Sequence, residues 1–168
     1  MITVVDIFSD IVSEVQKVYD PAGFEKPYYM HGHPVEIATI LSEKDASDVY
    51  RYKKYPAICL FQDFDENWSA DSIECNALNI AIITDTKAEF EASERYQNTF
   101  KDELYPIFNI LIDKIKSSKH LNMHRDQITF VKTDRLFWGR NNQAIMNDFI
   151  DAIEISRLSL IFSNQCQL

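Results

Sequence analysis

A helical pattern through residues 87–118 constrains the fold of this chain more than any other feature. Apolar side chains recur there every three or four residues, the spacing that puts them on one face of an α-helix. Acidic residues near its start and lysines near its end both suit the helix dipole. We therefore predict one long helix as the organising element of the domain. Its apolar face includes Phe90, Phe100, Leu104, Leu111 and Ile115.

The predicted helix has a start signal and an internal break. Thr86 and Glu89 form a capping-box pattern, in which each side chain satisfies a free amide at the helix start. Pro106 lacks an N–H and its ring crowds the carbonyl of Asp102, so we expect a kink. A straight helix over these residues would be about 48 Å long. A compact chain of this size is only about 40 Å across, so the helix must bend or project.

Strands are predicted on both sides of the long helix. Residues 56–61 and 78–84 are apolar on both faces, which is typical of strands in a sheet covered on both sides. The acidic residues 62–77 between them are predicted to form a long loop. Residues 127–132 alternate between apolar and polar side chains and are predicted to form a third strand.

The last predicted strand, residues 152–162, contains a change of parity. Apolar residues alternate with polar ones at each end of the strand. At one end they occupy odd-numbered positions and at the other even-numbered positions, so a regular strand would place them on opposite faces. A single bulge near Ser156 or Arg157 would correct the phase. The residues brought onto one face would be Ile153, Ile155, Leu158, Leu160 and Phe162.

The N-terminal third is predicted to be helical and irregular. Residues 6–18 have the spacing of an amphipathic helix. Residues 20–30 are interpreted as a loop rich in aromatics, and residues 43–54 as a polar surface connection.

Residues 34–43 fit either a helix or a strand. Pro34 suits the first turn of a helix, because its missing N–H costs nothing there. His33 and Glu36 would then cap the helix, and its buried stripe would be Ile37, Ile40 and Leu41. The alternation of Val35, Ile37 and Thr39 is equally consistent with a strand.

These elements predict an α/β (α+β) fold in a single domain over residues 1–168. We expect a mostly antiparallel four-stranded sheet packed against the long, Pro-kinked helix and an N-terminal helix. Residues 1–54 would form a helical and loop region packed on a sheet-and-helix core of residues 55–162. Hydrophobic residues make up 46% of the chain, enough to bury such a core.

The net charge of −9 disfavours specific nucleic-acid binding, because a negative surface repels a phosphate backbone. Basic residues at the end of the long helix are interpreted as offsetting the helix dipole. They are Lys114, Lys116, Lys119, His120, His124 and Arg125. The odd cysteine count fits a reducing compartment, with Cys59 expected to be buried. The sequence shows no signal peptide and no membrane span, so synthesis in the cytosol is expected.

Residues 63–74 match the ligand spacing of a calcium-binding EF-hand loop. The ligand positions are occupied by Asp63, Asp65, Asn67, Ser69, Asp71 and Glu74. However, Trp68 stands where the sharp turn needs glycine, and the flanks are predicted strands rather than helices. Two histidine pairs, His31 with His33 and His120 with His124, lack further ligands at metal-site spacing. We therefore predict no metal site and no cofactor.

Motifs for catalysis are also missing from the sequence. There is no Gly-x-Ser-x-Gly pattern and no Cys–His signature, and three glycines cannot build a phosphate-binding loop. We therefore predict that the protein is not an enzyme. Aromatic and arginine side chains in predicted loops instead favour protein–protein contacts. The candidate oligomer-interface residues are Trp68, Arg135, Phe137, Trp138 and Arg140.

Several short segments follow one another along the chain in a distinctive order. They are Lys-Tyr-Pro-Ala-Ile-Cys-Leu-Phe (54–61), a second strand (78–83), Glu-Arg-Tyr (94–96) with Leu-Tyr-Pro-Ile (104–107) on the long helix, and Asp-Ala-Ile-Glu-Ile (151–155). Over residues 55–162 this arrangement resembles the small neck and tail-terminator proteins of tailed bacteriophages.

The resemblance implies a virion structural protein that is assembled in the host bacterial cytoplasm. Such a subunit forms an oligomeric ring at the head–tail junction, beside other neck or tail proteins, and has no catalytic residues or cofactor. Contacts within a ring are heterologous, and residues 62–77 and 133–147 are expected to supply them. Two alternatives remain: a cytosolic calcium- or metal-binding domain or small enzyme using residues 63–74, and a monomeric protein-interaction adaptor.

Overall fold

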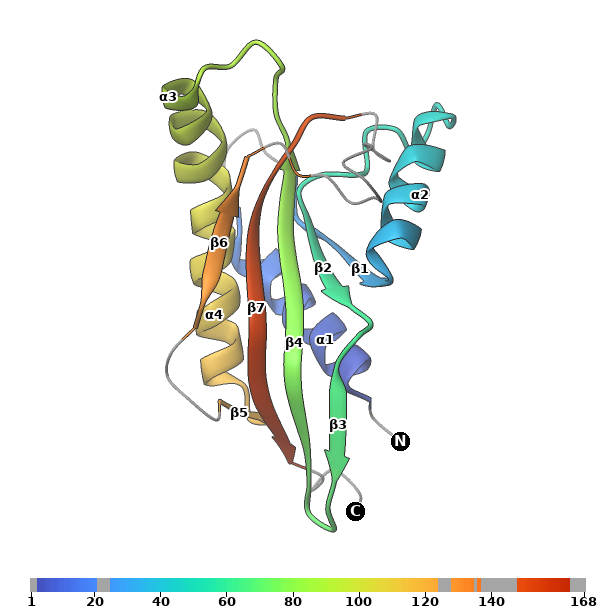
Figure 1. Ribbon diagram of the computed structural model, residues 1–168, viewed down its shortest axis with the longest axis vertical. Helices are drawn as coiled ribbons and strands as arrows, with labels where there is room; N and C mark the ends of the chain where they lie inside the picture. The colour runs from blue at the N-terminus through green and yellow to red at the C-terminus, as the bar shows by residue number, and fades with distance from the viewer. Residues whose placement is uncertain (1–2, 21–24, 124–127, 135, 137–147, 164–168) are drawn as a thin grey trace.

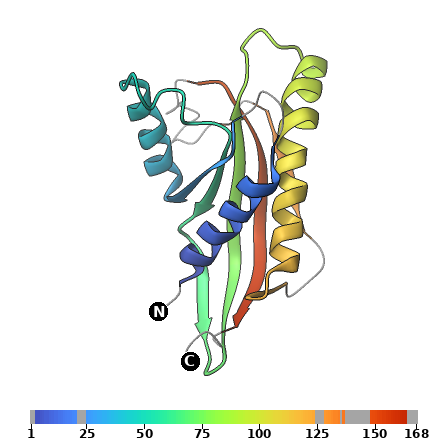
Figure 2. The ribbon, with the colours of Figure 1, turned by 180° about the vertical axis from the view of Figure 1, so that it is seen from behind.

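A computed structural model describes residues 3–20, 25–123, 128–134, 136 and 148–163. In this part of the chain a mixed sheet is covered by helices on both faces, which confirms the mixed α/β class (Figures 1 and 2). The helices are α1 (Val4–Val18), α2 (Pro34–Asp45), α3 (Ala92–Arg95), the π-helix η1 (Tyr96–Leu104) and α4 (Tyr105–Ser117). The strands are β1 (Tyr28–Gly32), β2 (Ala57–Phe61), β3 (Asp65–Trp68), β4 (Ser72–Asp85), β5 (Leu121–Met123), β6 (Phe130–Thr133) and β7 (Ile150–Ser163).

The sheet contains seven described strands rather than the four expected. Its order is β1-β2-β4-β7-β5, with β3 pairing with β4 and β6 pairing with β7. The pairing of β1 with β2 is parallel, and every other pairing is antiparallel. The strands that the sequence did not predict are β1, β3 and β5, each at most five residues long. Such short segments carry too little alternation to be recognised before their neighbours in the sheet are known.

The bulge predicted in β7 is confirmed. Ser156 and Arg157 together lie opposite the single residue Asn79 of β4, and Arg157 has a positive φ of 55°. The N–H of Arg157 donates to Asn79 Oδ1 at 3.2 Å, which satisfies an amide that the ladder leaves out. All five apolar residues predicted for this face are buried in one hydrophobic cluster with α1 and the long helix.

A second bulge, in β4, compensates for the first. Here Asn76 and Ala77 lie opposite Ser159 of β7, and Ala77 has a φ of 60°. The two bulges lie close together along the paired strands and divide the sheet into two halves. We call the part beside β2 and β6 the α2 half, and the part beside β3 and β5 the hairpin half. Because both strands shift phase, each keeps an apolar face towards α1 and the long helix in both halves.

The second face of the sheet differs between the halves. In the α2 half it is apolar and buried beneath α2, with Cys59, Ala81, Ile83, Ile150 and Ala152 in one cluster. In the hairpin half the same face carries mostly polar side chains, which are exposed or half-buried. They include Asp65, Asn67, Ser72, Glu74, Asn76 and Asn122. Figures 1 and 2 show α2 at one end of the sheet only.

The long helix starts later than predicted. It begins at Ala92, and the N–H of Glu91 donates to the side chain of Glu94 at 3.0 Å. The capping box expected at Thr86 and Glu89 is therefore wrong. Thr86 instead extends from β4, and its hydroxyl lies 3.3 Å from that of Thr99.

The kink expected at Pro106 is replaced by a π-helical stretch directly before it. At the end of η1 the N–H of Tyr105 donates to the carbonyl of Phe100, five residues earlier, as in a π-helix. The wider turns leave space between the ring of Pro106 and the preceding carbonyls. They also fit a position at which proline has no N–H to donate. The helix then continues as one rod along β4 and β7, each 14 residues long (Figure 2). The fold is elongated, so a helix of this length neither bends sharply nor projects.

The N-terminal predictions are confirmed in part. The first helix exists, and α2 resolves residues 34–43 as a helix whose start is capped by His33 Nδ1, an acceptor for the N–H of Val35 at 3.2 Å. Ile37 and Leu41 are buried as expected, but Ile40 is 37% exposed. The loop expected at residues 20–30 is wrong at its end, where Tyr28–Gly32 forms β1.

Candidate functional site

Of the five predicted interface residues, the structure describes Trp68. It ends β3, its side chain is 54% exposed, and its Nε1–H donates to Glu66 Oε2 at 3.0 Å. The other four, Arg135, Phe137, Trp138 and Arg140, lie outside the described residues. The geometry of the predicted interface can therefore be built only around Trp68 and the strand that carries it.

The long loop expected over residues 62–77 is a β-hairpin. β3 pairs with the start of β4, and the chain turns where the N–H of Ser69 donates to the carbonyl of Ser72 at 2.8 Å. All four residues of β3 are exposed, so this strand shows none of the apolar alternation by which strands are recognised. The hairpin is held together by the backbone pairing of β3 with β4. The outer edge of β3 has no strand partner among the described residues.

The hairpin also holds the candidate calcium ligands in two extended strands rather than in a curled loop. Asp65 and Asn67 lie in an extended strand, and Glu74 is the cross-strand partner of Asn67 in β4. An EF-hand loop instead curls its ligands around one point. No group of three or more His, Cys, Asp or Glu side chains among the described residues is placed to hold a metal ion.

The opposite edge of the sheet is formed in the α2 half by β6. Phe130 packs on Phe108 of the long helix with ring centroids 4.7 Å apart, yet remains 38% exposed. Val131 points to the other face, beside its pairing partner Glu154, and is 55% exposed. Strands β3 and β6 lie at opposite edges of the sheet (Figure 1). Each carries an exposed apolar side chain, Trp68 and Val131 respectively.

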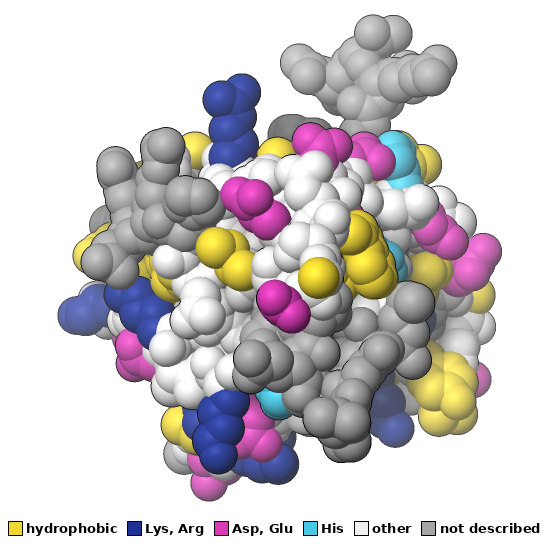
Figure 3. All heavy atoms as spheres, turned by 90° about the horizontal axis from the view of Figure 1, so that it is seen from below, with side chains coloured by type: hydrophobic (Ala, Val, Ile, Leu, Met, Phe, Trp, Pro, Cys, Tyr) yellow, Lys and Arg dark blue, Asp and Glu magenta, His cyan; other side chains and the backbone are white. Residues whose placement is uncertain are grey.

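The end of the molecule that carries the β3–β4 turn has a mixed surface. In the view from that end, hydrophobic and acidic side chains lie near the middle of the face (Figure 3). The basic side chains of the described residues lie towards its rim. Such a surface suits contact with another protein better than contact with a phosphate backbone.

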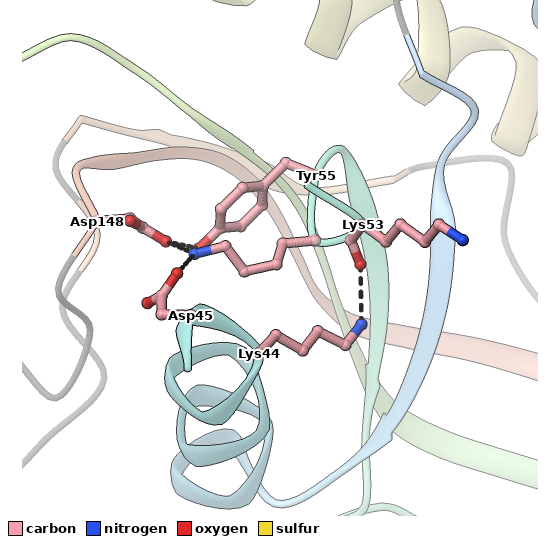
Figure 4. Close-up of polar contacts among 6 residues, drawn as sticks. Lys44, Asp45, Lys53, Tyr55 and Asp148 are labelled. Atoms are coloured by element: carbon pink, nitrogen blue, oxygen red, sulfur yellow. Dashed lines mark hydrogen bonds and ion pairs between the residues drawn. The ribbon is translucent and has the colours of Figure 1, made fainter. Parts of the chain in front are cut away.

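A second candidate site is a pocket of about 690 Å³ in the α2 half. It is lined by the end of α2 and the turn after it, the residues just before β2, the end of β4 and the π-helix. Lys54, at its edge, is only 5% exposed, although residues 43–54 were predicted to lie on the surface. Its ammonium group is bonded to Asp45 and Asp148, and the hydroxyl of Tyr55 donates to Asp148 at 3.0 Å (Figure 4).

The ion pairs keep Lys54 charged in spite of its burial. Burial alone would lower the pKa of Lys54, but the bonds to Asp148 and Asp45 outweigh it and raise the pKa. Burial and the neighbouring Asp148 carboxylate also raise the pKa of Tyr55, which keeps its hydroxyl protonated as a donor. The cluster ties the end of α2 to Asp148, in the segment that leads into β7.

Glu103 is the least expected group in the pocket. It lies on the π-helix, is 7% exposed, and accepts a hydrogen bond from the hydroxyl of Thr84 at 2.8 Å. Burial raises its pKa to about 7, the Thr84 bond opposes this, and the negative charge of Asp85 adds to it. Burial raises the pKa of the Tyr19 hydroxyl, and the nearby charge of Glu103 raises it further.

Sequence reasoning singled out neither Lys54 nor Glu103. A signal for Glu103 existed, because it lies beside Leu104 and one turn after Phe100, at the margin of the apolar stripe of the long helix. Lys54 had no comparable signal, since it sits at the end of a polar segment. Its partners come from distant parts of the chain, and only the fold brings them together.

No known protein family matches the chain, and no curated protein sequence matches it. None of the described helices combines the length and apolarity needed to cross a membrane.

Proposed function

We propose that this protein is a structural subunit that assembles into a ring, as a connector or terminator at the head–tail junction of a tailed bacteriophage. One observation carries the proposal: exposed apolar side chains lie at two opposite edges of one sheet, Trp68 on β3 and Val131 on β6. A closed ring needs two different patches on each subunit, because every contact is head-to-tail.

The two patches differ in chemistry, as heterologous contacts require. Trp68 extends from a strand whose outer edge lacks a strand partner among the described residues, so backbone N–H and C=O groups are available beside an aromatic anchor. Val131 is an exposed aliphatic side chain on β6, on the face opposite to that of its half-packed neighbour Phe130. Buried aromatic anchors supply much of the energy of protein contacts.

The paired strands β4 and β7 and the long helix also fit a subunit of a ring. The sheet is rigid along its length, because β4 and β7 pair through both halves and both are backed by the long helix. A rigid body with fixed edges repeats the same angle at each contact, which is the condition for closure. In this function the protein acts by assembly, with neighbouring neck and tail proteins as its partners.

The test uses one variant at each edge. Trp68→Ala and Val131→Asp should each abolish rings, measured by sedimentation velocity and negative-stain electron microscopy. Val49→Asp is the matched control, because Val49 is 63% exposed but lies in the turn after α2, away from both edges. It should leave the rings intact.

Mixing the two variants separates a ring from a symmetric dimer. Each variant keeps one good patch, so an equimolar mixture should form a heterodimer and stop there. Rings that persist in both variants would overturn the assignment of these edges. A wild-type chain that remains monomeric at all concentrations would favour the adaptor alternative. The virion role is checked by gene context, with portal and capsid genes expected alongside.

A further inference from the structure

The two edges of the hairpin half lie at the same level of the sheet. Residues of β3, β4, β7 and β5 pair across it in continuous rows, and one row consists of Trp68, Ile73, Phe162 and Leu121. β3 forms one edge and β5 the other (Figure 1). Among the described residues, neither strand has a partner on its outer side. Each edge therefore offers backbone N–H and C=O groups to another chain.

The directions of the strands allow the sheet to continue from one copy of the chain into the next. The pairings β3–β4, β4–β7 and β7–β5 are all antiparallel, so β3 and β5 run in opposite directions. A second copy placed beside the first, with its strands along the same axis, thus presents its β5 antiparallel to β3. Antiparallel strands in this position can exchange backbone hydrogen bonds, as in recognition by strand addition.

The two edges also carry opposite charge. Five of residues 63–74, around β3, are acidic and none is basic. Residues 114–123, which end the long helix and form β5, contain three lysines and one histidine but no acidic residue. Asp71, in the turn of the hairpin, is exposed, and so are Lys116 and Lys119 beside β5. Opposite edges of one subunit are complementary in charge, which favours a head-to-tail contact between copies.

The same charges disfavour a symmetric contact between two β3 strands. Two copies of β3 could also pair in antiparallel fashion, about a two-fold axis. That contact would bring two acidic hairpins together, and like charges on neighbouring strands repel each other. The basic edge of a second copy is therefore the better complement to β3.

A head-to-tail contact would also cover Trp68. Its pairing partner Ile73 lies in the cluster beneath α1 and the long helix, as does Leu121 at the other end of the row. A neighbour joined at the same level brings its Leu121 and half-buried Met123 beside the Trp68 ring, so an aromatic anchor meets an apolar surface. Because the strands are antiparallel, the turn after Trp68 then lies beside Lys119 of the neighbour.

We propose that β3 of one subunit pairs with β5 of the next, and that basic residues 114–120 of that second copy hold the acidic hairpin, residues 63–74. The inference rests on the proposed ring, and it names the strands and charges through which neighbouring subunits meet. β6 pairs with β7 on the same side as β5, so Val131 lies farther along the same edge.

The experiment reverses one charge on each edge of the full chain and measures assembly by sedimentation velocity. Asp71→Lys and Lys119→Glu should each weaken association roughly fivefold, because each replaces an attraction between exposed charges by a repulsion. The double variant exchanges the two charges and should restore assembly to near the wild-type level. Lys53→Glu is the matched control for Lys119→Glu, since it makes the same change of net charge at an exposed position after α2. It should leave assembly unchanged.

Hydrogen exchange tests the strand pairing itself. The amides of residues 65–68 and 121–123 should exchange more slowly at concentrations at which rings form than at concentrations at which the chain is monomeric. Residues 47–53, in the turn after α2, are the internal control, and their exchange should be the same in both.

The outcomes separate this inference from the proposed function. Rings that tolerate both charge reversals as well as they tolerate Lys53→Glu would overturn the inference alone, and so would unchanged exchange at residues 65–68 and 121–123 in assembled rings. Stronger association of Asp71→Lys, with no effect of Lys119→Glu, would indicate the symmetric contact and overturn the pairing of β3 with β5. A wild-type chain that stays monomeric would overturn the inference and the ring together.

Discussion

The α2 half and the hairpin half of the sheet are built from the same two strands but are covered differently. β4 and β7 run through both, and both halves bury one face against α1 and the long helix. In the α2 half the second face is also buried, beneath α2. In the hairpin half that face is mostly polar, and none of the described helices covers it (Figure 1).

This difference shows how one sheet can contain both a stable core and a surface available for contacts with other molecules. Burying apolar area on both faces makes the α2 half the more stable part, since apolar burial is the main favourable contribution to folding. The α2 half also contains buried ionisable side chains. Lys54 is paired with a carboxylate there, and burial raises the pKa of Glu103, which favours its protonated form. The hairpin half is free to present β3 to another molecule.

The largest expected effect comes from placing a polar group on the second face of each half. Ile83→Asn, beneath α2, should lower the free energy of unfolding by about 3–5 kcal/mol, because it leaves a cavity and a buried amide. Ile161→Asn, on the same face of the hairpin half, should cost only about 1 kcal/mol. Urea unfolding measures both, and equal losses would contradict the difference between the halves.

The buried ion pair of the α2 half should have the next largest effect. Arg95 Nε lies 3.4 Å from Asp151 Oδ2, and both side chains are almost fully buried. Asp151→Asn leaves Arg95 charged in a buried place and should cost about 3 kcal/mol. Glu14→Gln, which breaks an exposed pair with Lys17, should cause no measurable change by urea unfolding. A small loss for Asp151→Asn would mean that water reaches the pair.

Glu103 should make the stability depend on pH. Its pKa in the folded protein, about 7, lies above the ordinary value of 4.5, so the folded state binds this proton more tightly than the unfolded state does. The contribution of Glu103 to stability is therefore largest below pH 4.5 and is lost as the pH rises to about 7. Glu103→Gln should stabilise the protein by roughly 2–3 kcal/mol at pH 8 and leave it nearly unchanged at pH 4.5. A stabilisation that is equal at both pH values would contradict this account.

The boundary between the halves can be tested through the backbone of the bulge. Arg157 adopts a φ of 55°, a backbone conformation that is strained for residues other than glycine. Arg157→Gly should therefore stabilise the protein by about 0.5–1 kcal/mol in thermal unfolding. Ser156→Gly, at the neighbouring position without a positive φ, should destabilise it instead. Destabilisation by both glycines would show that Arg157 is held by its side chain.

The smallest effect on stability is expected at the exposed edge of the hairpin half. Trp68→Ala should change the free energy of unfolding by less than about 0.5 kcal/mol, because the side chain is largely exposed. The same substitution should abolish ring formation, so its effects on assembly and on folding separate. A large loss of stability would place Trp68 in the core of the hairpin half instead.

Much of the central fold was predictable from local patterns. The bulge near Ser156 or Arg157 followed from a change of parity, since five apolar residues can share one face only if the phase shifts there. The strand over residues 56–61 and the burial of Cys59 followed from a continuous apolar run. The pKa of that thiol is raised to about 12 by burial, which keeps it protonated.

Less of the candidate sites was predictable. The hairpin was missed because the side chains of β3 are polar and exposed, so its strand geometry depends on pairing with β4. The Lys54 cluster was missed because Asp45 precedes it by nine residues and Asp148 follows it by 94. Contacts over such separations have no local signature.

The long helix shows most clearly how the two levels divide. The sequence by itself determined that residues near 92–117 are helical and which face is apolar, because that periodicity depends only on the spacing of side chains. The tertiary structure decided where the helix begins, that π-helical turns replace a kink before Pro106, and that Glu103 faces a pocket. Those features depend on the length of the sheet beneath the helix and on the partners that β4 places beside it.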